Sequence, residues 1–185
     1  PEIGLSLQLY FLSFIKLARY QVTSWGHPET TGNNSIDYFI SSSLIEAKDY
    51  EERFSEKVIL SDSLPMFYYK PKVKNLLKEE QINKTSKYSC PQTLFKLHPD
   101  FDKIIEGIQK EDKNSVFYFI KDPKKILYKI FIERLKKNSK IDLDKIIFLE
   151  NMNWEEYINH CGEVSVLLDP LFFGAGNSFY ESLFY

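Results

Sequence analysis

Residues 116–149, VFYFIKDPKKILYKIFIERLKKNSKIDLDKIIFL, decide the fold class of this chain. The apolar run 116–120 predicts a buried strand, residues 126–136 predict a helix, and the apolar run 146–149 predicts a second strand. Apolar strands that are separated by a helix are typical of a parallel sheet covered by helices on both faces. This stretch therefore predicts an α/β fold.

The same alternation continues outward in both directions. A short strand is expected at 88–90 and a helix from Pro99 to about Lys110. Beyond residue 149, a helix is expected at 154–160, a strand at 164–168 and another helix from Ser178 onward. Four strands that alternate with four helices predict a doubly wound sheet.

The first part of the chain predicts a separate parallel unit. A helix is expected over residues 1–19 and a helical turn over 51–56. Strands are expected at 21–25, 37–41 and 57–60. From residue 61 to 87 the composition changes to Pro, Lys, Glu and Asn, which favours a linker between the two units.

Composition and charge exclude several classes of protein. The 24 basic and 26 acidic side chains give a net charge of −2, so no electrostatic footprint for nucleic acid is expected. The two cysteines predict reduced thiols and a cytoplasmic protein, and the three histidines lack metal-ligand spacing. The apolar stretch 5–17 is too short and too polar to span a membrane.

Both ends of the chain predict a fragment. The sequence begins without Met and stops at Tyr185 inside an expected helix. We therefore expect parts of the functional site to be missing.

The loop 169–178 is the most informative candidate site. Gly174-Ala175-Gly176 would let a backbone approach a ligand closely, and Asn177-Ser178 suits the start of a helix whose free N–H groups favour phosphate. Glu181 would lie one turn inside that helix, where its carboxylate could accept hydrogen bonds from a ribose. The alternative is a tight turn whose glycines serve the chain geometry only.

Three further side chains are candidates because each follows an expected strand. Lys96 could neutralise charge on a leaving diphosphate, and Gln92 could hold a phosphate or a base edge. His27, between glycine and proline, could act as a base or a hydrogen-bonding group. The alternatives are a solvated surface lysine and a histidine that only bonds its own loop.

Five ordered stretches carry a family resemblance: 18–32, 36–39, 54–57, 90–102 and 168–181. Together they resemble the bacterial, SPINDLY-type relatives of O-GlcNAc transferase. The resemblance implies a GT-B architecture, in which two Rossmann-like lobes hold a nucleotide sugar between them. It makes residues 1–65 the end of the first lobe, 66–87 a linker and 88–185 the truncated start of the second lobe, with tetratricopeptide repeats expected upstream.

The resemblance also implies roles for individual residues. Lys96 would contact the diphosphate, Gln92 the nucleotide, Asn177 and Ser178 the phosphates, Glu181 the ribose, and Thr30 the sugar pocket. The animal enzymes have a histidine in place of Gly176, and a lysine and a histidine in place of Trp154 and Tyr157. These departures leave the donor base and the donor sugar open.

The expected activity is transfer of a sugar, GlcNAc from UDP-GlcNAc, to an acceptor hydroxyl such as a protein Ser or Thr. No Walker loop and no acidic metal motif are present in the sequence, so chemistry without a metal or a resident cofactor is expected. A protein or glycan acceptor is the expected partner, and the isolated chain is expected to be inactive. Two alternatives are a catalytically inactive module that binds nucleotide sugars or partners, and an epimerase of the same architecture.

Overall fold

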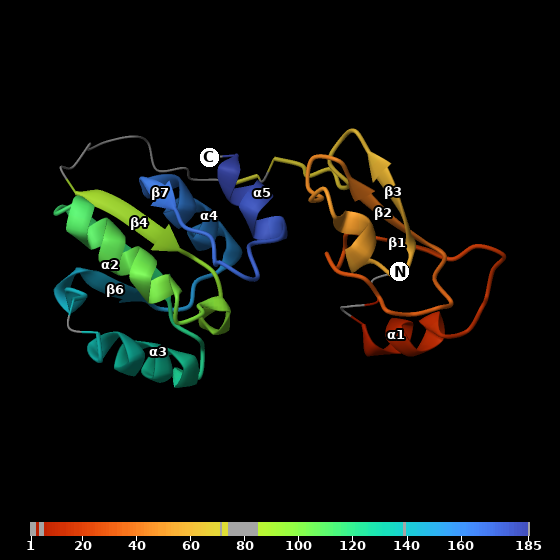
Figure 1. Cartoon of the computed structure of the whole chain (residues 1–185). Coiled ribbons are helices and arrows are strands. Elements are labelled where there is room, and N and C mark those ends of the chain that lie inside the picture. The colour runs from red at the N-terminus through yellow and green to blue at the C-terminus, as the bar shows by residue number, and fades with distance from the viewer. Residues whose placement is uncertain (1–2, 4–5, 71, 74–84, 139, 185) are drawn as a thin grey trace. The chain divides into compact units, whose positions relative to one another are not determined.

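The computed structural model describes residues 3, 6–70, 72–73, 85–138 and 140–184 (Figure 1). The chain divides into two compact units, Pro1–Phe67 and Tyr68–Tyr185. Part of the predicted linker, residues 71 and 74–84, lies outside the described residues, and the predicted lobe boundaries stay predictions. No helix in the described ranges is long and apolar enough to cross a membrane.

The first unit is built on a three-stranded parallel sheet in the order β1-β2-β3. Its elements are α1 (Leu7–Ser13), β1 (Val22–Ser24), β2 (Tyr38–Ser42), the 3₁₀ turn η1 (Tyr50–Arg53) and β3 (Lys57–Ser61). Phe39 of β2 is 1% exposed, and its ring centroid lies 4.6 Å from that of Phe54. This pair anchors the small core of the unit.

The helix predicted over residues 1–19 is wrong in its extent, because α1 ends at Ser13. The Ser13 hydroxyl donates to the Tyr10 carbonyl and accepts from Asn33 Nδ2 at 2.8 Å. Lys16 forms an ion pair with Asp37, immediately before β2. Contacts with the segment before the second strand therefore replace the helical bonds that the apolar pattern predicts.

The second unit has the predicted alternation of strands and helices. Its strands are β4 (Ser86–Cys90), β5 (Ser115–Ile120), β6 (Ile146–Leu149) and β7 (Val166–Leu167). Its α-helices are α2 (Phe101–Glu111), α3 (Ile126–Lys136), α4 (Trp154–Glu163) and α5 (Asn177–Leu183), with 3₁₀ turns η2 (Leu94–Lys96) and η3 (Leu143–Lys145).

The strands of this unit are parallel and stand in the order β6-β5-β4-β7, which is 3-2-1-4 in chain order. Successive right-handed crossovers run first to one side of β4 and then to the other. The direction of winding therefore reverses at β4, and the loops that follow β4 and β7 border the crevice where such sheets bind ligands. The predicted α/β class with a doubly wound sheet is confirmed.

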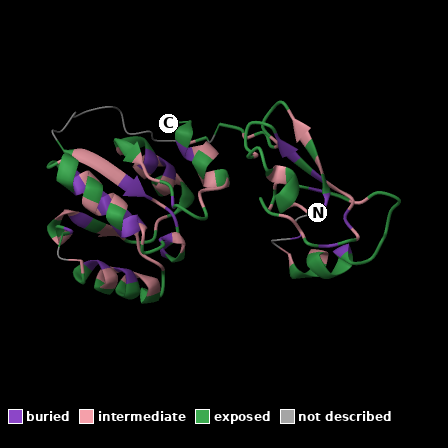
Figure 2. Cartoon of the chain, viewed as in Figure 1, coloured by how far each residue is buried: buried purple, intermediate pink, exposed green. Residues whose placement is uncertain are grey.

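Helices cover both faces of this sheet, as the alternating side chains of β5 show. Phe117 and Phe119 are fully buried in the core cluster with Phe101 of α2 and Phe131 of α3. Tyr118 points to the opposite face, where its ring meets His160 of α4. In Figure 2 the buried residues follow the strands and the inner sides of the helices, while the outer surfaces are exposed. The core thus holds the carboxyl edge of the sheet in a fixed position.

Folding stability is expected to fall below pH 6.5 because of His160. Its Nε2 lies 2.8 Å from the hydroxyl of fully buried Ser89 on β4. Burial, helped by the charge of Lys87, lowers the pKa of His160 below 6.5. The unfolded chain therefore binds a proton first as the pH falls, so this stability is fully present above pH 6.5 and is lost as the pH falls towards the folded pKa.

Thermal unfolding at pH 7.5 and at pH 5.5 would measure this loss of stability. The midpoint temperature Tm should fall by about 2–4 °C for each kcal/mol lost. His160→Gln should reduce the change of Tm between pH 7.5 and pH 5.5. His98→Gln replaces a half-exposed histidine and serves as the control. A dependence that is the same in wild type and His160→Gln would contradict the assignment.

Candidate functional site

Lys96 and Gln92 lie in the loop that follows β4, at the point where the sheet changes direction. Lys96 is the last residue of η2, and Gln92 is 7% exposed. The Lys96 ammonium group donates to Gln92 Oε1 at 2.9 Å and to the Gly174 carbonyl at 3.0 Å. The loop after β4 is therefore tied directly to the loop after β7.

The charge of Lys96 has no carboxylate partner within ion-pair distance among the described residues. Burial lowers the pKa of Lys96, while Asp169 and Cys90 act in the opposite direction. Burial raises the pKa of Cys90 to about 12, so this thiol is neutral near pH 7. The Lys96 Nζ atom also lies 4.8 Å from the centroid of the Phe173 ring. A half-buried cation held by neutral oxygens and an aromatic face is suited to an anionic ligand.

The loop after β7 is closed by one carboxylate. Asp169 Oδ1 accepts from the Ala175 N–H at 2.7 Å, and Asp169 Oδ2 fills the space that a Cβ at Gly174 would occupy. Gly174 therefore leaves room for the Asp169 carboxylate. A Cβ at Gly176 would meet nothing within 4 Å, so open space beside the backbone exists only at the second of these two glycines.

The start of α5 completes the set of polar groups. Gln92 Nε2 donates to the Ser178 hydroxyl at 3.0 Å, which extends the chain of bonds from Lys96. Asn177 is exposed and accepts a 2.9 Å hydrogen bond from the Tyr68 hydroxyl, whose ring stacks on Tyr180 at 4.3 Å. The helix starts at Asn177, one residue before its predicted start, and spans seven residues.

A cavity of about 320 Å³ opens beside this hydrogen-bonded chain. Gln92 and Asp169 line it from the two loops, Ser178 lines it from α5, and Tyr157 and Cys161 line it from α4. Burial raises the pKa of Tyr157, and it raises that of Cys161 to about 11. The two titratable groups by which α4 lines this cavity, Tyr157 and Cys161, are therefore neutral near pH 7. The volume of the cavity lies at the lower end of the range for small-molecule sites.

Glu181 lies one turn into α5 and bonds an aromatic side chain. Its Oε2 lies 3.4 Å from the indole nitrogen of Trp154, the first residue of α4. This is a long, weak hydrogen bond, and both side chains are partly exposed. The carboxylate is thus oriented by Trp154 while it keeps capacity to accept further bonds.

A second hollow, of about 200 Å³, lies beyond the ends of β4, β5 and β6. Gln92 and Thr93 line it from one side, and Ile120 and Asn151 from the other. Gln92 therefore borders both cavities. Among the described residues, no group of three or more His, Cys, Asp and Glu side chains is arranged to hold a metal ion.

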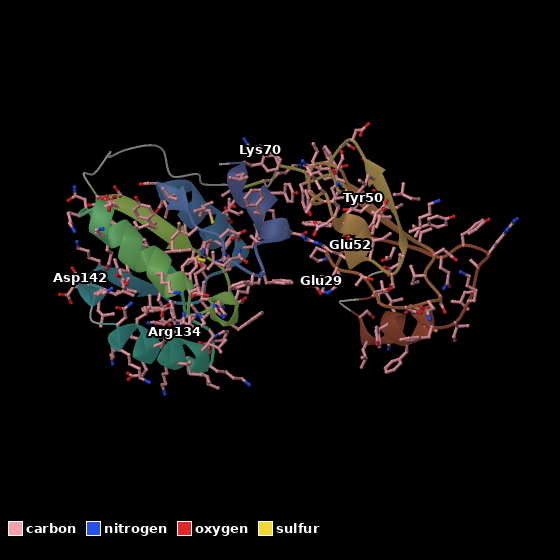
Figure 3. The ribbon with its side chains drawn as sticks, in the orientation of Figure 1. Glu29, Tyr50, Glu52, Lys70, Arg134 and Asp142 are labelled. Carbon is pink, nitrogen blue, oxygen red and sulfur yellow. The ribbon has the colours of Figure 1, made fainter. Side chains whose placement is uncertain are left out.

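His27 and Thr30 lie in the first unit, where they line a cavity of about 180 Å³. His27 Nε2 is 3.9 Å from Glu29 Oε2, and the His27 side chain is 40% exposed. Glu29 projects from this loop (Figure 3). His27 is therefore accessible to a ligand, with one carboxylate beside it.

The Thr30 hydroxyl is committed to its own loop. It donates to Glu56 Oε2 at 2.7 Å and accepts from the N–H groups of Ser55 and Gly32. Burial acts to raise the pKa of Glu56, but hydrogen bonds from Thr31 and Thr30 outweigh it and keep the pKa below its ordinary value. Thr30 thus lines the cavity while its hydroxyl braces the loop.

The structure brings Lys96, Gln92 and Ser178 into one hydrogen-bonded chain. Gly176, Asn177 and Glu181 lie on the same loop and helix, whereas His27 and Thr30 belong to the other unit. The sequence analysis included Asp169 in its candidate loop but gave it no role, and it missed Tyr68. The position of Asp169 before a proline and a glycine turn suggests a bond within the loop, but nothing local marks Tyr68.

Doubly wound α/β sheets bind ligands at the point where the winding reverses, and in the described part of this chain that point carries Lys96 with no carboxylate within ion-pair distance. No protein-family model matches the chain. The chain is 26% identical over 165 residues to the probable UDP-N-acetylglucosamine–peptide N-acetylglucosaminyltransferase SEC of Arabidopsis thaliana, covering 82% of this chain and 16% of that protein. It is 28% identical over 191 residues to the UDP-glucose:protein N-beta-glucosyltransferase of Actinobacillus pleuropneumoniae serotype 5b, covering 96% of this chain and 28% of that protein.

Among solved structures, a mutant of the O-GlcNAc transferase of Thermobaculum terrenum aligns with a TM-score of 0.76 at 17% identity, over 90% of this chain and 32% of that one. Its likeness supports the GT-B-like fold. The homologues and this structural neighbour are O-GlcNAc transferase-like glycosyltransferases, at modest identity, and the resemblance seen in the sequence is confirmed. The chain spans less than a third of the length of each of these relatives.

Proposed function

We propose that the protein carrying this chain is a glycosyltransferase that moves GlcNAc from UDP-GlcNAc to the hydroxyl of a protein Ser or Thr. The observation that carries the proposal is Lys96, a half-buried cation whose hydrogen bonds go to the neutral oxygens of Gln92 and Gly174. A diphosphate would supply the ion-pair partner that Lys96 does not have among the described residues. Gln92 borders two cavities, so a nucleotide whose diphosphate meets Lys96 has room for its nucleoside.

The relatives support both substrates in general terms. The names of the Arabidopsis and Actinobacillus proteins share a UDP-sugar donor and a polypeptide acceptor. They differ in the sugar, which is N-acetylglucosamine in one and glucose in the other. The proposal of GlcNAc and of a Ser or Thr hydroxyl is therefore narrower than what the two names have in common.

In the proposed reaction, the bond between the anomeric carbon and the β-phosphate oxygen breaks. The anomeric carbon forms a new bond to the acceptor oxygen, and the acceptor proton passes to His27 as the proposed base. Negative charge that builds up on the departing UDP is stabilised by Lys96, with Ser178 and Asn177 as further phosphate partners and Glu181 on the ribose. We propose that this chemistry proceeds without a metal ion.

The test uses purified full-length protein with UDP-GlcNAc or UDP-glucose and a set of Ser-, Thr- and Asn-containing peptides. UDP release and mass spectrometry of the peptides measure turnover, and calorimetry measures UDP binding. Transfer of GlcNAc to Ser or Thr that persists in EDTA is the expected result. Transfer of glucose to Asn would correct the donor and the acceptor.

UDP binding without turnover on any peptide would instead favour the inactive binding module. Absence of both binding and turnover would contradict the nucleotide site itself. The 185-residue chain should be assayed in parallel, because it is expected to be inactive alone.

A further inference from the structure

We propose that Asp169 is a positioning residue that holds Lys96 at the candidate diphosphate site, through the loop that it closes and through its charge. This inference rests on the proposed function, because the diphosphate role of Lys96 comes from there. Asp169 itself is assigned no contact with the donor.

The first link is steric and local. Asp169 Oδ1 accepts from the Ala175 N–H at 2.7 Å, so one carboxylate oxygen closes the turn across six residues. The other oxygen occupies the space that a Cβ at Gly174 would fill, so the glycine leaves room for this carboxylate. The hydrogen bond to Ala175, the residue after Gly174, therefore ties the backbone of this turn to Asp169.

The second link connects this backbone to the cation. The Gly174 carbonyl accepts from Lys96 Nζ at 3.0 Å, and the Phe173 ring, one residue earlier, lies 4.8 Å from the same atom. Two of the groups that surround the ammonium thus belong to the turn that Asp169 closes. The third, Gln92 Oε1, comes from the loop of Lys96 itself.

The third link is electrostatic. The ionisable groups that act on Lys96 are Asp169, from the loop after β7, and Cys90, from β4. Burial lowers the pKa of Lys96 and the negative charge of Asp169 opposes that effect, whereas burial raises the pKa of Cys90 to about 12 and leaves this thiol neutral near pH 7. At neutral pH, Asp169 is therefore the group of these two that favours the charged form of Lys96.

Two substitutions separate these links. Asp169→Asn keeps an oxygen that can accept from Ala175 but removes the charge, whereas Asp169→Ala removes both. Asp144→Asn, at an exposed position on η3, is the matched control. NMR of the lysine side chains in the full chain measures the pKa of Lys96, and the signal missing from Lys96→Arg identifies the Lys96 resonance. Calorimetry measures the affinity for UDP between pH 6.5 and pH 9.5.

We expect Asp169→Asn to lower the pKa of Lys96, so that UDP affinity is lost at a lower pH than in wild type. Asp144→Asn should match wild type, which also controls for titration of UDP itself. Asp169→Ala should weaken UDP binding at every pH, and in full-length protein it should lower kcat about 10- to 100-fold, as misplacement of a reacting group does. At pH 7, Asp169→Asn should have a kcat and a UDP affinity much closer to wild type than those of Asp169→Ala.

An equal Lys96 pKa in wild type and Asp169→Asn would overturn the proposal, even if the affinity fell. The same holds if Asp169→Ala binds UDP as wild type does. If the pKa of Lys96 falls in Asp169→Asn but wild type does not bind UDP, the coupling between the two residues stands and the proposed function fails.

Discussion

Replacing Lys96 by alanine is expected to lower the turnover of the full-length protein by about 30- to 1000-fold. This range corresponds to roughly 2–4 kcal/mol of transition-state stabilisation, as for the loss of one preorganised donor at a developing negative charge. The reason is that Lys96 is the cation held between the two loops at the reversal point of the sheet. Calorimetry with UDP and steady-state kinetics with the donor sugar would measure the loss.

Two further variants sharpen this experiment. Lys96→Met keeps an unbranched chain against the Phe173 ring but removes the charge, so it separates the charge from the packing. Lys110→Ala removes a lysine from the exposed side of α2, where its side chain is 79% exposed, and should leave turnover unchanged. Normal UDP binding and normal turnover in Lys96→Ala would remove Lys96 from the site and most of the proposed mechanism with it.

Phe119→Ala is expected to cost about 3–5 kcal/mol of the free energy of unfolding of the second unit. Phe119 is fully buried near the carboxyl end of β5, and its ring centroid lies 5.1 Å from that of Phe131 and 5.8 Å from that of Phe148. Removing it leaves a cavity between the sheet and the helices α2 and α3. Since small domains are stable by only about 5–15 kcal/mol, this single change removes a large fraction of the total.

Urea denaturation followed by tryptophan fluorescence and circular dichroism would measure this cost as a lower midpoint with an unchanged slope. Ile130→Ala, on the solvent side of α3 at 61% exposure, is the control and should cost far less. A loss below about 1 kcal/mol for Phe119→Ala would contradict its place in a close-packed core.

The second unit was predictable from the sequence because every residue of its strand β5 is buried or half-buried between helices on the two faces of the sheet. Continuous apolar runs such as 116–120 cannot lie on a surface, and their spacing leaves room for one helix each. Prediction failed where tertiary contacts decide the outcome. The helix over residues 1–19 ends early at Ser13, and the strand over 164–168 shortens to Val166–Leu167, which pairs with β4 alone.

The candidate site was predictable in part for a topological reason. Lys96 and Ser178 follow different strands, and parallel strands bring their carboxyl ends to one edge. The bracing groups were not predictable. Tyr68 meets Asn177 across 109 residues, and Glu56 occupies the Thr30 hydroxyl from 26 residues away, so neither contact has a local pattern.

The long separations across the candidate site also have a consequence during protein synthesis. We expect β4 to pair first with β5, which follows it closely in the chain. The other edge of β4 pairs with β7, where Lys87 bonds Ser165 across 78 residues. The bond from Lys96 to Gly174 has the same sequence separation of 78 residues. At translation rates of about 5–20 residues per second, we expect this edge to stay unpaired for roughly 4–16 s. For that interval the nascent chain presents a strand edge that chaperones bind and that neighbouring nascent chains can join.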